Sequence, residues 1–339
     1  MSPLDKVMLL APAGSPEAAE AAFQAGADAI YVGLKGWSRG GYKGELTKEE
    51  LKRCLEQARR LGKGVRLAAN IIPKLEERAY LLEQLAELEA WGVEGVIVND
   101  PGFLSEVKRR LPNLPVTASI GCGALNEDDV AFYEGLGAAS VVLPGNLEPS
   151  EIAAIKAKVS ISVEVMLHMV QEFIQLGKCW MPSYLHFDPA EKPEVGTRLT
   201  GSMKRGGVGA CFKICQQPWV LELQGSGGRG QGGGVFPGPG TWYSEPCPLL
   251  FPAQQISRTA ELSDFLNAGV DIVKLQGRSL PPELLAPLVR RYRLGIEAWA
   301  TGRVQGMGFR VQGFSLSPGP GPLHPESASL PPKWTVIGR

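Results

Sequence analysis

The sequence is poor in the residues and motifs that carry most hydrolytic and phosphate chemistry. Its 339 residues include three histidines and six cysteines. They contain no H-E-x-x-H helix and no P-loop ending in Gly-Lys-Ser or Gly-Lys-Thr. Neighbouring histidines are too few to build a three-histidine zinc site. The sequence therefore carries neither the helical zinc-peptidase motif nor a P-loop.

An excess of one charge and a long apolar run are also lacking. Lysine plus arginine number 35, as do aspartate plus glutamate, so no global field draws the chain onto nucleic acid or an anionic membrane. A local pair such as Lys204–Arg205 is still compatible with phosphate binding. No eighteen consecutive residues are apolar, and "MSPLDKVMLL" has no signal-peptide pattern. We expect a soluble, cytoplasmic protein with no membrane span, in which neighbouring cysteines are more often ligands or catalytic thiols than disulfides.

Eight short apolar runs alternate with helical segments along the chain. Near-continuous apolar runs, rather than strict alternation, are typical of strands buried on both faces of a parallel sheet. The runs lie at residues 7–14, 29–36, 65–72, 95–100, 116–121, 140–146, 162–168 and 271–278. Helix-start signals follow, such as Ser15 before Pro16, and Thr47 with Glu50 three residues later. The pattern predicts a (β/α)8 TIM-like barrel.

The pattern breaks between the seventh and eighth runs for about a hundred residues, which is too long for a simple loop. We expect a barrel over 1–303 that includes a cysteine-bearing insertion over 169–250. In such barrels this insertion lies over the functional face, where the strands end. The glycine-rich stretch "GSGGRG" at 225–230 matches a dinucleotide fingerprint, but no strand leads into it, so a linker is the better interpretation. The Pro/Gly/Ser-rich segment 304–339 is predicted to be a weakly ordered tail.

Four of the six cysteines fall in the expected insertion: Cys179, Cys211, Cys215 and Cys247. Four thiolates can enclose zinc or hold an iron–sulfur cluster. Zinc sites more often use two close pairs, whereas this set has one close pair and two distant cysteines, which favours iron–sulfur. Unliganded buried thiols are the third interpretation. Cys54 lies in a helical segment and is expected to be an ordinary buried thiol, while Cys122 follows the fifth strand on the functional face.

Several quoted stretches resemble a known family. They are "LLAPAGSPEAAEAAFQAGADAIYVGLK" near the start, "LGKCWMPSYL" and "GACFKICQQPW" in the insertion, and "AGVDIVKLQGRSLPPELLAPLVRRYRLGIE" near the end. Over about residues 7–300 the chain is similar to the collagenase-like "U-thirty-two" peptidases. Within that family it looks most like the iron–sulfur ubiquinone biosynthesis proteins U and V.

The resemblance implies an oxygen-independent hydroxylase, or a hydroxylase subunit, with a [4Fe-4S] cluster held by Cys179, Cys211, Cys215 and Cys247. Its substrate would be an isoprenoid quinone precursor or an RNA base, with prephenate as the oxygen donor. The alternatives are a peptidase, or a catalytically silent partner in a heterodimer with a homologous subunit. The strand-end residues that would form the site are His168, Lys274 and Arg278 as catalytic groups, and Asn70, Ser119, Asn146 and Gln276 as substrate-binding groups.

Two departures from the family pattern affect these expectations. Glu172 stands where the family has a cysteine, so Cys215 becomes the natural fourth ligand. The family's "KIEGR" is "KLQGR" here, with Gln276 in place of a carboxylate, while Lys274 and Arg278 remain. Lysine and arginine suit an anionic donor. If the missing glutamate is an acid or base elsewhere in the family, Gln276 serves here only as a hydrogen-bonding group or marks a silent subunit.

Overall fold

The computed structural model describes residues 7–38, 44–171 and 254–302, together with short strand segments at 219–221, 224–225, 241–242 and 247–249. The chain divides into two compact units. One comprises Met1–Lys178 with Gln254–Arg310, and the other comprises Cys179–Ala253 with Val311–Arg339. The first unit contains nearly all of the described residues.

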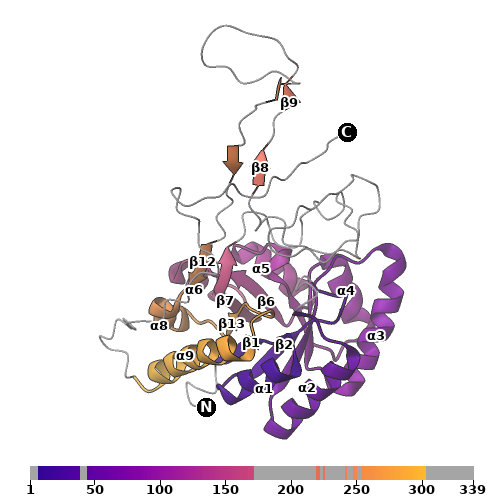
Figure 1. Ribbon diagram of the computed structural model, residues 1–339, viewed down its shortest axis with the longest axis horizontal. Coiled ribbons are helices and arrows are strands. Elements are labelled where there is room, and N and C mark those ends of the chain that lie inside the picture. The colour runs from indigo at the N-terminus through magenta and orange to yellow at the C-terminus, as the bar shows by residue number, and fades with distance from the viewer. Residues whose placement is uncertain are drawn as a thin grey trace. The chain divides into compact units, whose positions relative to one another are not determined.

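Eight parallel strands of the first unit close into a barrel (Figure 1). In order around the ring they are β1 (Met8–Pro12), β2 (Ala29–Val32), β3 (Gly64–Ala69), β4 (Gly95–Val98), β5 (Val116–Ala118), β6 (Ser140–Pro144), β7 (Ser162–Gln171) and β13 (Ile272–Leu275). Closure follows because β13 pairs with both β7 and β1, while β6 pairs with β7. Each strand falls within or overlaps one of the eight predicted runs, so the predicted (β/α)8 fold is confirmed.

One further strand lies outside the ring. β12 (Gln254–Ser257) pairs antiparallel with the carboxyl-terminal half of β7, opposite residues 168–171. β7 therefore runs three residues beyond the predicted strand and gives its last residues an additional partner. The chain leaves and re-enters the barrel unit along this two-stranded ribbon.

The described helices surround the strands (Figure 1). They are α1 (Pro16–Gln24), α2 (Lys48–Leu61), α3 (Arg78–Trp91), α4 (Pro101–Arg110), α5 (Glu127–Gly135), α6 (Pro149–Lys156), α8 (Leu262–Asn267) and α9 (Pro282–Ala300), with 3-10 turns η3 (Leu75–Glu77), η4 (Ile120–Cys122) and η6 (Thr259–Glu261). The side chain of Ser15 accepts from the Ala18 backbone to cap α1, and Thr47 and Glu50 form a reciprocal capping box on α2. Both predicted helix starts are confirmed.

Strand alternation sorts the core into two regions. Side chains such as Leu9, Val98 and Val165 face the helices in the large outer core, whereas a second cluster fills the inside of the ring. That inner cluster consists of Leu10, Ala29, Tyr31, Ala68, Ile97 and Ile272. It is small, and Val142, Met166 and Met169 form a further apolar cluster beside it. Several other inward positions carry polar or charged side chains. The candidate site is built from those positions.

The second unit is described only in its short strands. β8 (Trp219–Leu221) pairs antiparallel with β11 (Cys247–Leu249), and β9 (Gln224–Gly225) pairs with β10 (Thr241–Trp242). Cys247 lies in β11 opposite Leu221. Cys179, Cys211, Cys215 and Glu172 lie outside the described residues, as does the predicted tail over 304–339. The proposed cluster ligands and the tail therefore stay predictions.

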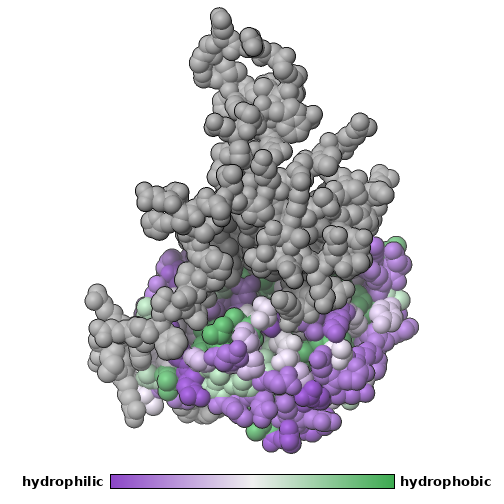
Figure 2. All heavy atoms as spheres, in the orientation of Figure 1, coloured by the Kyte–Doolittle hydropathy of each residue, from purple (hydrophilic) through white to green (hydrophobic). Residues whose placement is uncertain are grey.

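Within the described part of the chain, no helix combines the length and the apolar character that a membrane crossing requires. The described surface in Figure 2 is mostly hydrophilic, with scattered hydrophobic residues. Large exposed apolar side chains include Leu61 on α2 and Leu294 on α9. Single exposed residues of this kind are normal on a folded domain and define no patch.

Candidate functional site

A buried ion cluster occupies the inside of the barrel. Glu164 on β7 has 0% exposure, and one of its carboxylate oxygens, Oε1, accepts from Nζ of Lys274 on β13. The second oxygen, Oε2, lies 3.3 Å from Nη1 of Arg66 on β3. One carboxylate thus holds two cations from strands that are distant in the sequence. Removing three charges from water is unfavourable unless they compensate one another, and this arrangement leaves the cluster with one excess positive charge.

The cluster continues toward the amino-terminal end of the barrel. Nη2 of Arg66 lies 3.7 Å from Oε1 of Glu94, which directly precedes β4 and is 40% exposed. Burial lowers the pKa of Lys274 below its ordinary value, and the neighbouring Glu164 carboxylate opposes that shift. Lys274 is therefore a cation whose charge is largely satisfied within the barrel.

The ring of Tyr31 on β2 lies close to two cations, Lys274 and Arg278. Nζ of Lys274 lies 4.5 Å from the centroid of the Tyr31 ring, and the Arg278 guanidinium carbon lies 5.7 Å from the same centroid. The Tyr31 hydroxyl donates to the Leu275 carbonyl at 2.9 Å. Burial raises the pKa of Tyr31, so the ring stays neutral at pH 7. The negative face of an aromatic ring favours a nearby cation, and here it lies beside both Lys274 and Arg278.

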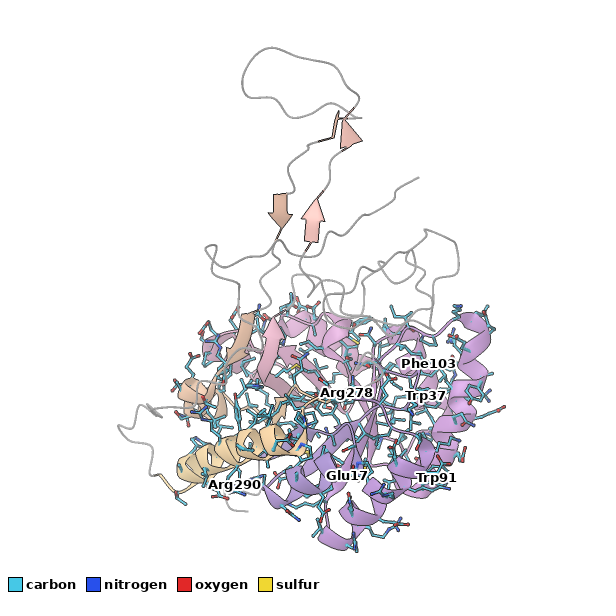
Figure 3. All side chains as sticks on the ribbon, in the orientation of Figure 1. Glu17, Trp37, Trp91, Phe103, Arg278 and Arg290 are labelled. Carbon is cyan, nitrogen blue, oxygen red and sulfur yellow. The ribbon has the colours of Figure 1, made fainter. Side chains whose placement is uncertain are left out.

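Hydrogen bonds fix the orientation of Arg278, which follows β13. Its Nη1 donates to Oγ of Ser38 at 2.6 Å, and the Ser38 hydroxyl donates onward to Oε1 of Glu45 at 2.8 Å. The other Glu45 oxygen accepts from the Gly36 backbone at 3.0 Å. In Figure 3 Arg278 lies toward the centre of the barrel, whereas Arg290 lies on the outer helix α9. The guanidinium is therefore held in one orientation by groups from the loop after β2.

Two glycines make room for this arrangement. A Cβ atom at Gly33 would lie 2.2 Å from Oγ of Ser38 and 2.3 Å from Nη1 of Arg278. A Cβ atom at Gly14 would lie 1.9 Å from the backbone carbonyl oxygen of Arg278. Real Cβ atoms do not approach other atoms so closely, so any side chain at either position would displace Arg278. The position of Arg278 is therefore determined by its backbone surroundings as well as by its hydrogen bonds.

Polar residues follow three adjacent strands at the carboxyl-terminal end of the barrel. They are the half-buried Asn70 after β3, Asn99 after β4 and Ser119 after β5, and the last two are 1% and 2% exposed. The Ser119 backbone N–H donates to the Val98 carbonyl at 2.8 Å, which brings the ends of β4 and β5 together. Asn99 was not among the predicted site residues. The signal that could have identified it is a polar residue ending the run "GVIVN" just before the helix cap Asp100.

His168 lies on a different side of the barrel wall. A register shift lies between Lys274 and Leu275, and it pairs His168 with Leu275, whose side chain faces the helices. The His168 ring contacts the ring of Tyr292 on α9 edge-on, with centroids 6.3 Å apart. Burial lowers the pKa of His168 to about 4, so the imidazole is neutral at pH 7.

The other predicted substrate-binding residues are dispersed around the mouth. Asn146 follows β6 and is exposed. Gln276 follows β13, is half-buried, and its backbone N–H donates to the His168 carbonyl at 2.7 Å. The structure thus places Lys274 and Arg278 beside the same Tyr31 ring, and it places Asn70 and Ser119 at the ends of β3 and β5, on either side of β4. It does not bring His168 to either group.

A known protein family matches most of the chain. Residues 14–312 match Peptidase family U32. The chain belongs to this family. The resemblance read from the sequence motifs is thereby confirmed at the level of the family.

The curated U32 relatives carry different names. Over 87% of this chain and 64% of its own length, "tRNA hydroxylation protein P1" of Bacillus subtilis (strain 168) is 26% identical. The "23S rRNA 5-hydroxycytidine C2501 synthase" of Escherichia coli (strain K12) is 23% identical over 86% of this chain and 40% of its own length. A "Collagenase" of Porphyromonas gingivalis (strain ATCC BAA-308 / W83) is 22% identical over 87% of this chain and 66% of its own length. The chain thus spans less than two thirds of each of these relatives.

The described part of this U32 chain contains no group of three or more histidine, cysteine, aspartate or glutamate side chains arranged to hold a metal ion. Cys54 is buried in α2, as expected, and burial raises the pKa of its thiol to about 12. The Cys122 thiol is buried and donates to the Val98 carbonyl at 3.4 Å. The cysteines that the sequence assigns to a cluster lie in the other unit.

The ion cluster gives a stability prediction. Glu164→Gln keeps the size of the side chain but leaves Lys274 and Arg66 without their buried carboxylate, so we expect the free energy of unfolding to fall by about 3–5 kcal/mol. Glu94→Gln is the matched control, because Glu94 contacts the same arginine from an exposed position, and it should cost about 0–1 kcal/mol. Urea unfolding at pH 7 measures both. Equal losses in the two variants would contradict the central role of Glu164.

His168 gives a pH prediction. The unfolded histidine takes up a proton near pH 6.5, whereas the folded one does so only at about 4. Protonation therefore favours the unfolded state, and stability should be complete above pH 6.5 and decline as the pH falls toward 4. The contribution is about 3 kcal/mol from the size of this shift. His168→Phe keeps a ring against Tyr292 and removes the titration. Unfolding curves of the parent and this variant that change in parallel between pH 6.5 and 4 would refute the assignment.

Proposed function

We propose that the chain is an oxygen-independent hydroxylase, or the barrel-bearing subunit of one, that acts on an RNA base. The observation that carries the proposal is the match over 87% of the chain to a protein named for tRNA hydroxylation, together with the rRNA 5-hydroxycytidine synthase. A shared barrel by itself does not determine chemistry, because one fold supports many reactions. The chemistry therefore depends on the residues at the mouth of the barrel.

Hydroxylation without dioxygen requires an oxygen donor. Inserting one oxygen atom into a C–H bond of the base oxidises the base by two electrons, so the donor that loses the oxygen is reduced by two. A hydroxylated carboxylate such as prephenate is a donor of the required class. Arg278 presents a planar, permanently charged guanidinium in a fixed orientation, which suits a carboxylate or phosphate group.

The two cations of the predicted site differ in how well they can bind an anionic group. Lys274 is 3% exposed and is paired with Glu164, so its charge is already compensated. Arg278 is half-buried and thus more accessible than Lys274, and its planar guanidinium donates to the Ser38 hydroxyl. We therefore assign binding of the anionic group to Arg278.

We further propose that Cys179, Cys211, Cys215 and Cys247 hold a [4Fe-4S] cluster. Two ligands three residues apart can reach adjacent corners of one cluster, and the distant pair is brought in by folding of the surrounding segment. When bound, such a cluster supplies one-electron transfer. The four residues belong to the second unit, of which Cys247 in β11 is the only one within the described residues.

The peptidase alternative is favoured by the collagenase relative. A peptidase needs an activated nucleophile or a metal-bound water near a base. The one described histidine packs against Tyr292 and is neutral at pH 7. The described mouth of the barrel is therefore better suited to binding an anion and a polar planar group than to peptide hydrolysis.

Hydroxylation is tested by anaerobic expression of the full chain in a bacterial host whose own U32 genes are deleted. Mass spectrometry of nucleosides from tRNA and rRNA should show one nucleoside that gains a single oxygen. Arg278→Lys cannot reproduce the planar fork, and we expect it to lower this product about tenfold or more. Arg290→Lys on the outer face of α9 is the control and should leave the product unchanged.

Other outcomes of this experiment are decisive. A hydroxylated quinone precursor with unchanged RNA would move the substrate to the quinone. Cleavage of casein or collagen by the purified protein would favour the peptidase. Product that forms only with a homologous subunit, and survives Arg278→Lys in this chain, would identify this chain as the silent partner.

Metal content tests the cluster separately from activity. Protein purified without oxygen should be brown, bleach on reduction and contain about four irons per chain. Alanine at any one of the four cysteines should remove most of the iron, whereas Cys54→Ala should not, because Cys54 is buried in the barrel unit. Stoichiometric zinc in a colourless protein, or iron content indifferent to Cys215→Ala, would refute the assignment.

A further inference from the structure

Asn99 is a buried amide that has no hydrogen-bond partner within the described part of the chain. It follows β4 and is 1% exposed, and neither Oδ1 nor Nδ2 has a partner among the residues that the structure describes. Burying an amide without hydrogen bonds is unfavourable, and nearly all buried polar groups have a hydrogen-bond partner. A cost of this kind is tolerated where a ligand supplies the missing partners.

The position of Asn99 points to the inside of the barrel. Gly95–Val98 alternate between the two sides of the wall, with Ile97 in the inner cluster and Val98 in the outer core. The same alternation places Asn99 on the inner side, one residue beyond the last strand pair of β4. The amide is therefore at the carboxyl-terminal end of the lumen, where ligands of parallel barrels bind.

The inward-facing polar side chains of the next layer, Thr117 and Ser140, differ from Asn99 in having a partner. Thr117 on β5 and Ser140 on β6 also face inward, and their hydroxyl oxygens lie 2.7 Å apart in a mutual hydrogen bond. These buried polar groups satisfy each other. At the level of Asn99, the adjoining Ser119 hydroxyl instead accepts from its own turn, from the Gly121 backbone at 3.4 Å. The amide of Asn99 thus has no such internal partner in the described residues.

We propose that Asn99 recognises the hydrogen-bonding edge of a pyrimidine base. Its carboxamide offers one acceptor and one donor side by side, which complements the N3 and O4 groups of uracil or, after the amide rotates by half a turn, the N3 and N4 groups of cytosine. The neighbouring strand ends, Asn70 and Ser119, add polar groups at the same rim. This assignment rests on the proposed action on an RNA base, and it names the residue that recognises that base.

The test uses Asn99→Leu in the full chain. Leucine has nearly the shape of asparagine and no hydrogen-bonding group, so it removes the recognition without leaving a cavity. If the amide exists for a ligand, the thermal midpoint of the variant should equal or exceed that of the parent, because a buried unpaired polar group is lost. Asn113→Leu, at an exposed residue in the loop before β5, is the matched control.

Two readouts separate this inference from the proposed function. The first is the affinity for cytidine 5′-monophosphate and uridine 5′-monophosphate, measured by calorimetry, which needs no chemistry. We expect Asn99→Leu to weaken the binding of at least one of them about tenfold or more, and Asn113→Leu to leave it unchanged. The second is the hydroxylated nucleoside formed in cells, which should fall by a similar factor.

Each outcome has a defined meaning. Nucleotide binding that depends on Asn99, without any hydroxylated RNA, supports the inference and refutes the proposed function. Hydroxylated RNA that is formed equally by the parent and Asn99→Leu keeps the proposed function and overturns the inference. A lower thermal midpoint in Asn99→Leu than in the parent, or a parent that binds neither monophosphate, also overturns it.

Discussion

The pairing of one buried carboxylate, Glu164, with two cations organises the inside of this barrel. Lys274 and Arg66 come from strands β13 and β3, so the ion cluster ties together positions that are far apart in the sequence. Buried charges are tolerated only when they are mutually compensated, and removing any one partner leaves the others unpaired. The cluster therefore constrains which side chains can occupy the lumen.

In the proposed function, two separate groups at the mouth of the barrel bind the anion and the base. Arg278 is fixed by Ser38, by the ring of Tyr31 and by the space that Gly33 leaves for it. Asn99 offers an uncompensated donor and acceptor on the inner side of the wall. A charged group and a planar polar group could thus be bound at once, as the transfer of an oxygen atom from an anionic donor to a base requires.

Membership of family U32 leaves the chemistry open, because its curated names include hydroxylation proteins and a collagenase. The barrel scaffold supports many reactions, so the choice between hydroxylation and peptide cleavage depends on the side chains at the strand ends. Here they present a fixed guanidinium and an amide with no partner among the described residues, while the strand-end histidine packs against α9. The described geometry is more consistent with binding an anion and a base than with cleaving a peptide bond.

The sequence by itself determined the eight strands and the caps at Ser15 and Thr47, because buried parallel strands and helix starts have local signatures. It also identified Lys274 at the end of the last strand. Only the tertiary structure supplied the partner of that lysine, Glu164, because an ion pair between strands has no local spacing to reveal it. The side of the wall on which His168 lies was likewise decided by the register shift beside it. Strand pairing fixes register, and one residue of slippage reverses the side that a side chain faces.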